Sequence, residues 1–150
     1  MPKISVIIPL FNKGFIISET LQSVLVQTFT DFEIVIVNDG STDNGFEVVS
    51  KFSDNRINLF QQENKGAAAA RNLGIEKATG ELIAFLDADD YWFPNHLEEL
   101  MKLYTDFPNC GMYGSRYLMK ISEKKTIKTT YLPLVSNDFR GILPDFFKAS

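Results

Sequence analysis

The sequence contains one cysteine, Cys110, which excludes an internal disulfide and a metal site built from several thiolates. It lacks a run of about 20 apolar residues, the length that a helix needs to cross a bilayer. The first residues have neither the length nor the cleavage site of a signal peptide. The only histidine, His96, has no second candidate ligand four residues later, where Leu100 stands, so we interpret it as a surface residue rather than a metal ligand. The single cysteine fits a reducing compartment.

Basic residues are also too few to favour nucleic acid as a partner. Lys and Arg number 15 against 19 Asp and Glu, which gives a net charge of −4. At 150 residues, 45% hydrophobic and 23% charged, residues 1–150 are expected to form one soluble domain. We expect a cytoplasmic protein, either free or peripherally attached to the inner face of the membrane. The 13 phenylalanines predict either a Phe-rich core or a surface that meets another part of the protein or a membrane.

Apolar segments alternate with amphipathic or Ala-rich segments over the first 106 residues. The expected strands are residues 4–10, 33–38, 56–61 and 82–86, and the expected helices are 15–27, 43–52, 67–78 and 94–106. Ser41 or Thr42 is expected to cap the second helix. This alternation predicts an α/β fold, a Rossmann-like, mostly parallel sheet flanked by helices. Beyond Pro108 the pattern predicts a C-terminal β-hairpin of strands 111–121 and 126–132, and a partly helical tail over residues 137–150.

The strongest functional signal follows the fourth expected strand. Its five apolar residues predict burial on both faces, and Asp87, Asp89 and Asp90 come directly after them. Because isolated buried charges are costly, these carboxylates must emerge at the strand's carboxyl end, where open α/β sheets bind ligands. They repel one another unless a cation neutralises them, and hard oxygen ligands suit Mg²⁺ or Mn²⁺. The alternative is a solvated acidic loop ahead of a helix N-terminus.

Two further residues have both a functional and an ordinary interpretation. Asp39 lies at the carboxyl end of the second expected strand, but Asp-Gly-Ser is also common turn chemistry. Arg71 lies in the middle of the Ala-rich helix, where it can face a ligand or pair on the surface with Glu76 or Glu63.

Four motifs occur in a specific order and spacing. The first two are Ser-Val-Ile-Ile-Pro-Leu-Phe-Asn at 5–12 and Val-Ile-Val-Asn-Asp-Gly-Ser-Thr-Asp at 35–43. The third is Asn-Lys-Gly at 64–66 with Ala-Arg-Asn at 70–72 and Gly-Ile at 74–75, and the fourth is Phe-Leu-Asp-Ala-Asp-Asp at 85–90. Each motif is weak alone, but as a set they closely resemble family 2 glycosyltransferases, which have the GT-A fold. The resemblance covers residues 4 to 103.

This resemblance implies a nucleotide-diphosphate sugar donor and a divalent ion, Mn²⁺ or Mg²⁺. The nucleotide-binding residues that it implies are Pro9, Phe11, Asn12, Asp39, Arg71, Asp87 and Ala88. Asp39 matches the residue that hydrogen-bonds the base, Arg71 lies beside the diphosphate, and Asp87 lies near the ribose. Asp89 is the expected metal ligand, with Asp87 and Asp90 as the other candidates. Unlike dinucleotide-binding folds, the chain has no Gly-x-Gly-x-x-Gly after its first strand.

The resemblance also implies the reaction: transfer of the sugar, most commonly from a UDP-sugar, to a polysaccharide or lipid-linked glycan of the cell envelope, with inversion. The carboxylates after Asp106 are Glu123, Asp138 and Asp145, and none matches the family's catalytic base. We therefore expect the base to lie beyond Ser150. Residues 1–150 would then be the donor-binding portion, shortened on the acceptor-binding side.

Two alternatives remain at the level of sequence. One is a domain that binds a nucleotide sugar without transferring it, because its first hundred residues would be the same. The other is a haloacid-dehalogenase-like phosphatase, which also places Asp-x-Asp after an apolar strand. That family expects the motif on the first strand, with Thr or Val after the second Asp, whereas here it follows the fourth strand and precedes Asp90.

Overall fold

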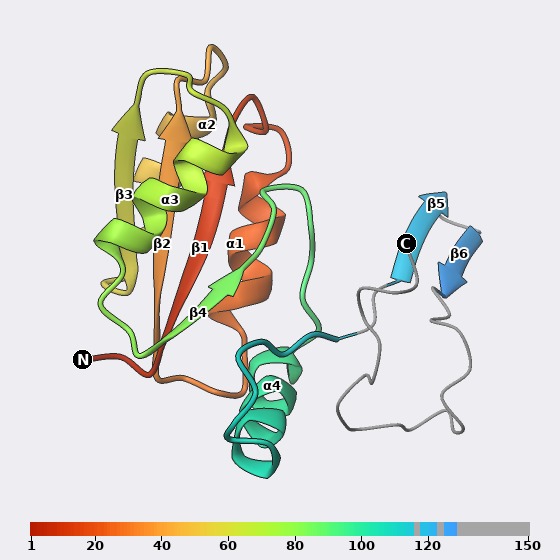
Figure 1. The fold of residues 1–150 in the computed structure, drawn as a ribbon. Helices are drawn as coiled ribbons and strands as arrows, with labels where there is room; N and C mark the ends of the chain where they lie inside the picture. Colours follow the sequence, from red (N-terminus) through yellow and green to blue (C-terminus); the bar gives the residue numbers. More distant parts are fainter. Residues whose placement is uncertain (116–117, 123–124, 129–150) are drawn as a thin grey trace. The chain divides into compact units, whose positions relative to one another are not determined.

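The fold is that of a computed structural model, which describes residues 1–115, 118–122 and 125–128 (Figure 1). The chain divides into two compact units, and the boundary follows His96. The elements of the first unit are β1 (Ile4–Leu10), α1 (Ile17–Leu25), β2 (Phe32–Asp39), α2 (Gly45–Ser50), β3 (Ile57–Gln62), α3 (Ala67–Lys77) and β4 (Leu82–Phe85). The expectation of one domain over residues 1–150 stays a prediction.

The first unit is built on a four-stranded parallel sheet in the order β3-β2-β1-β4. Ile7 in β1 lies opposite Val35 in β2 and Phe85 in β4. Figure 1 shows α3 on one face of the sheet and α1 and α2 on the other. The predicted α/β fold is therefore confirmed, with element boundaries shifted by at most a few residues. Because all four strands are parallel, their carboxyl ends meet at one edge of the sheet.

Burial explains why these segments form these elements. The central strands β1 and β2 are covered on both faces, so almost every residue in them is buried. On α1, Ile17, Leu21 and Val24 are spaced four and three residues apart and are fully buried against the sheet. On α3, a Cβ added to Gly74 would lie 2.4 Å from Cγ2 of Ile7, so only glycine allows this helix to pack so closely on β1.

The prediction that the strand before the acidic motif is buried on both faces was wrong. Ile83 is 38% exposed and Phe85 is 50% exposed, whereas Leu82 and Ala84 are half-buried. The reason is the strand order, which places β4 at the edge of the described sheet, paired with β1 alone. Several phenylalanines are likewise on the surface rather than in the core: Phe11, Phe15, Phe85 and Phe93.

A cluster of hydrogen bonds ties the sheet together at the end opposite the acidic motif. Oε1 of Glu33 accepts hydrogen bonds from the hydroxyl of Ser5 at 2.6 Å and from the backbone amide of Thr79 at 2.6 Å. Partial burial of Glu33 would raise the pKa of this carboxyl, but the hydrogen bonds outweigh burial and lower the pKa. Glu33 thus joins β1, β2 and the turn before β4.

The second unit contains most of α4 (His96–Asp106), and β5 (Leu118–Ser122) pairs antiparallel with β6 (Lys125–Lys128). The predicted hairpin is present, but its first strand was predicted too long, because residues 111–115 are not in a strand. This segment contains Gly111 and Gly114, and glycine disfavours strands. Residues 129–132 of the predicted return strand and the predicted tail at 137–150 lie outside the described residues. Among the described helices, none has the length and apolarity to cross a membrane.

Candidate functional site

A cavity of about 200 Å³ opens at the carboxyl edge of the parallel sheet. The residues that line it are Pro9, Leu10, Phe11, Lys13, Asp39, Ala67, Arg71, Asp87, Ala88 and Asp89. The structure thus brings together most of the residues that the motifs predict, from segments up to 80 positions apart. Two predicted site residues, Asn12 and Asp90, are next to lining residues in the sequence but are not themselves among the lining residues. Leu10, Lys13 and Ala67 line the cavity but were not predicted as site residues.

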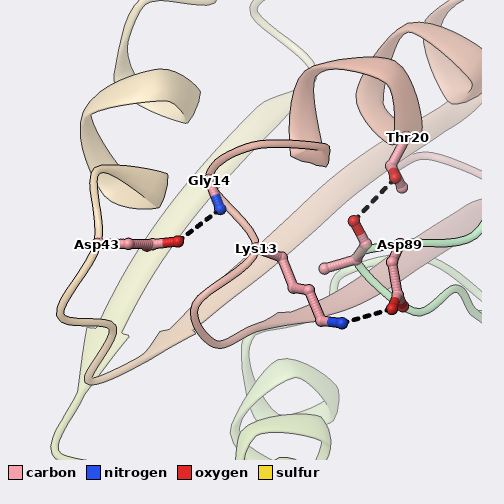
Figure 2. Close-up of polar contacts among 6 residues, drawn as sticks. Lys13, Gly14, Thr20, Asp43 and Asp89 are labelled. Atoms are coloured by element: carbon pink, nitrogen blue, oxygen red, sulfur yellow. Dashed lines mark hydrogen bonds and ion pairs between the residues drawn. The ribbon is translucent and has the colours of Figure 1, made fainter.

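Two ion pairs bridge the cavity. Arg71 donates from Nη2 to Oδ1 of Asp87, so it faces the acidic motif rather than Glu63 or Glu76. Lys13 Nζ lies 2.6 Å from Oδ2 of Asp89 (Figure 2). With Asp39 included, the lining carries three carboxylates and two cationic side chains, an excess of one negative charge. An anionic ligand therefore meets both signs of charge here, and a divalent ion would reverse the excess.

Asp90, the third carboxylate of the motif, is in a different environment. Partial burial raises its pKa, and the neighbouring charges of Asp87 and Asp89 raise the pKa further. Its backbone amide donates to the carbonyl of Asp87 at 3.0 Å and closes the turn. Asp90 therefore binds a proton more readily than an isolated aspartate, unless a cation occupies the site.

Asp39 connects the end of β2 to the start of α3. The residue as a whole is only 2% exposed. Oδ1 accepts hydrogen bonds from Gln62 Nε2 at 2.7 Å and from the amide of Lys65 at 2.9 Å, and Oδ2 accepts one from the amide of Gly66 at 2.9 Å. A carboxylate has about four acceptor sites, so about one remains for a ligand. Most of the hydrogen-bonding capacity of Asp39 thus serves to hold the cavity wall together.

The turn after β1 is fixed by the loop after β2. Asn12 adopts a left-handed backbone conformation with φ of 50°, which asparagine tolerates better than most residues. Its Oδ1 accepts a hydrogen bond from the Thr42 amide at 2.8 Å, and its own amide donates to the Ser41 hydroxyl at 3.1 Å. Asn12 therefore orients its neighbours Phe11 and Lys13 rather than lining the cavity itself.

The prediction that Ser41 or Thr42 caps α2 was wrong. Asn44 is the N-cap residue, and its own side chain makes no capping hydrogen bond. Asp43 instead bridges the two loops, because its Oδ2 accepts from the Gly14 amide at 2.8 Å (Figure 2). Its Oδ1 accepts from the Gly45 amide at 2.9 Å. Ser41 and Thr42 are engaged by the turn at Asn12, so tertiary contacts replaced the local cap.

Buried polar side chains of α1, and that of Gln27 just after it, hold the acidic segment in place. The Thr20 hydroxyl donates to the carbonyl of Ala88 at 2.9 Å (Figure 2). The Ser23 hydroxyl accepts from the amide of Trp92 at 3.2 Å, and Gln27 Nε2 donates to the Phe93 carbonyl at 2.8 Å. Sequence reasoning missed these residues. The available signal was three polar residues spaced three and four apart, two on the helix and one just after it, all buried at 1–4% exposure.

Thr20→Val is expected to lower the free energy of unfolding by about 1–3 kcal/mol, because it leaves the buried Ala88 carbonyl without its donor. Val has nearly the shape of Thr, so packing should change little. Denaturant unfolding of both proteins measures the difference. Thr30→Val, at an exposed position, is the matched control and should change stability by less than about 0.5 kcal/mol. Equal effects of the two substitutions would show that the bond to Ala88 contributes nothing.

The carboxylates suit a hard divalent ion by their chemistry. Asp87 and Asp89 are exposed at the cavity and offer the oxygen ligands that Mg²⁺ and Mn²⁺ prefer. Within residues 1–115, 118–122 and 125–128, no three His, Cys, Asp or Glu side chains converge well enough to hold an ion by themselves. The site therefore fits an ion that takes one or two ligands from the protein and the others from a bound phosphate and water.

Residues 5–146 match the model of the family "Glycosyl transferase family 2". The chain belongs to this family. Among curated relatives, it is 48% identical to the uncharacterized glycosyltransferase YibD of Escherichia coli over 103 residues, which are 67% of this chain and 30% of the relative. It is 45% identical over 117 residues to GlyG of Streptococcus pneumoniae, covering 76% of this chain and 39% of that one. The chain thus spans less than half the length of these relatives.

Two solved structures have the same GT-A architecture. Residues 1–349 of S. aureus TarS, in complex with UDP-GlcNAc, superpose with a TM-score of 0.66 at 33% identity over 71% of this chain and 32% of TarS 1–349. The mannosyltransferase PcManGT of Pyrobaculum calidifontis, in complex with GDP-Man and Mn²⁺, superposes with a TM-score of 0.57 at 31% identity over 61% of this chain and 28% of that one. The GT-A assignment is therefore confirmed for the parallel sheet and its helices.

Proposed function

We propose that this chain is the donor-binding part of a glycosyltransferase, and that its substrate is a nucleotide-diphosphate sugar bound in the cavity at the carboxyl edge of the sheet. The observation that carries the proposal is the clustering of Arg71, Lys13 and the carboxylates Asp87 and Asp89 around one cavity beside Asp39. Neighbours of the same fold were solved with UDP-GlcNAc and with GDP-Man, which supports a donor of this class.

Each part of the donor has a matching group in the proposed site. Asp39 has about one acceptor position left for a base donor, and Asp87 and Ala88 are placed for the ribose. Arg71 supplies planar donors that suit phosphate oxygens. Pro9 and Phe11 supply apolar surface for the nucleoside. A UDP-sugar is the donor that we propose, and a glycan or lipid-linked glycan is the proposed acceptor, with inversion at the sugar.

Asp89 would bind Mn²⁺ or Mg²⁺, with Asp87 and Asp90 as the other candidate ligands. A bound divalent ion acts as a Lewis acid that stabilises the negative charge of a nucleoside diphosphate leaving group. The protein's own contribution is to orient the carboxylates through Thr20 and to place Arg71 beside the diphosphate. None of the described residues is assigned as the catalytic base.

Assays can distinguish the proposed function from the two alternative functions. A binding domain without transferase activity would bind the donor in the same way, and only transfer to an acceptor distinguishes it. A phosphatase would release inorganic phosphate, but the family and the position of the acidic motif after β4 do not support it.

UDP is expected to bind this chain only when Mn²⁺ or Mg²⁺ is present, because the cavity has an excess negative charge that repels a diphosphate. Calorimetric titration with the ion, and again with a chelator, measures the effect. UMP, which has the same nucleoside and one phosphate, is the control ligand and its affinity should depend less on the ion. Equal UDP affinity with and without chelator would remove the metal from the proposal. No binding of UDP or of other nucleoside diphosphates under either condition would overturn the proposed function.

A further inference from the structure

Lys13 is a charged residue of the cavity that no motif singled out. Its ammonium lies against Asp89, the carboxylate proposed to bind the ion, at 2.6 Å. Both side chains are partly exposed, at 38% and 44%, so water and ions can reach the pair. The lysine therefore lies where a divalent cation would be attracted, and it carries the same sign of charge.

The backbone of Lys13 is fixed although its side chain can move. Its carbonyl accepts hydrogen bonds from the amides of Ile16 at 3.1 Å and Ile17 at 2.9 Å, at the start of α1. The residues before and after it, Asn12 and Gly14, are bound to the loop after β2. Only rotation of the four-carbon stem is left to move the ammonium, and lysine is a flexible point charge with three donors.

We propose that the Lys13 ammonium neutralises Asp89 when no ion is bound, that a divalent ion must displace it, and that the displaced ammonium then binds the diphosphate. This inference rests on the proposed function. An ammonium and a dication cannot share one carboxylate without repulsion, so the ion is held weakly by the protein alone. A diphosphate relieves that repulsion, because it offers the ammonium a new anionic partner and the ion further oxygen ligands. The ion and the nucleotide therefore bind cooperatively.

Lys13→Met tests the inference, because it removes the charge but keeps most of the length of the stem. Mn²⁺ alone should bind the variant about tenfold more tightly than the parent, since the competing cation is gone. With saturating Mn²⁺, UDP should bind the variant about fivefold more weakly, because one phosphate partner is lost. Electron paramagnetic resonance of free Mn²⁺ measures the first constant, and calorimetry measures the second. Structural damage would lower both the affinity for Mn²⁺ and the affinity for UDP. A rise in the first together with a fall in the second therefore identifies the proposed role.

Two further variants complete the design. Lys13→Arg keeps the charge and should bring both constants back toward those of the parent. Lys3→Met is the matched control, because Lys3 forms an ion pair of the same length, 2.6 Å, with Glu81 at the other end of the sheet. It should change neither constant.

The outcomes separate the inference from the proposed function. A parent that binds UDP with Mn²⁺, together with a Lys13→Met variant whose affinity for Mn²⁺ alone is unchanged, undetectable or lower, overturns the inference and leaves the function standing. Failure of UDP to bind the parent with Mn²⁺ overturns the proposed function itself.

Discussion

Asp89→Asn is expected to abolish the extra thermal stability that UDP and Mn²⁺ give together, while the unliganded protein melts within a few degrees of the parent. The side chain is exposed beyond β4, and an exposed ion pair such as the one with Lys13 contributes about 0–1 kcal/mol. Asn keeps nearly the shape of Asp and one carbonyl oxygen, so packing at the turn should survive. It lacks the negative charge on which a hard dication with few protein ligands depends.

The size of this loss of thermal stability follows from the linkage between ligand binding and folding. A ligand at about 100 times its dissociation constant stabilises the folded state by about 2.7 kcal/mol, and the variant should lose this contribution. Thermal shift with nucleotide, with Mn²⁺ and with both is the measurement. Glu81→Gln, which breaks the ion pair with Lys3, is the control and should respond to the ligands as the parent does.

Two results would contradict the assignment of Asp89. If the variant still gained stability from UDP with Mn²⁺, the ion would be held by Asp87 or Asp90 instead. If the variant did not fold, Asp89 would be a structural residue, and a surface site for an ion would be ruled out at this position.

Asp39→Ala is expected to have a second large effect, on stability and on nucleoside binding together. It leaves the amides of Lys65 and Gly66 without their acceptor at the start of α3. Hydrogen bonds to charged groups contribute about 1.5–3 kcal/mol each, and we expect a total loss of about 2–4 kcal/mol after the loop relaxes. Denaturant unfolding measures this loss. Asp54→Ala, which removes a more exposed carboxylate paired with Arg56, is the control and should cost less.

The same substitution should weaken uridine binding by roughly ten- to a hundredfold if Asp39 also accepts a hydrogen bond from the base. Uridine has no phosphate, so its affinity does not depend on the ion or on Arg71. Gln62→Ala separates the two roles, because it removes a donor to Asp39 but keeps the carboxylate for the base. Unchanged uridine affinity in Asp39→Ala would leave this residue with its structural role alone.

The sequence alone was sufficient for the parts of the fold that depend on local pattern. Continuous apolar runs predicted β1 and β2, and apolar residues at helical spacing predicted α1, because burial on a sheet imposes these periods. It also predicted that Asp39 and Asp87 lie at the same edge, since parallel strands have their carboxyl ends on one side. The motifs, taken in order, identified the family.

Tertiary structure decided which side chains meet, and the sequence pattern does not encode that. Lys13 and Asp89 are 76 positions apart and form a pair only because β1 and β4 are neighbours in the sheet. The same strand order makes β4 an edge strand and exposes Phe85, contrary to its apolar pattern. Ser41 and Thr42 suit a helix cap locally, but the turn at Asn12 lies close enough to engage them. Periodicity specifies what a segment buries, whereas the packing of segments distant in sequence specifies its partners.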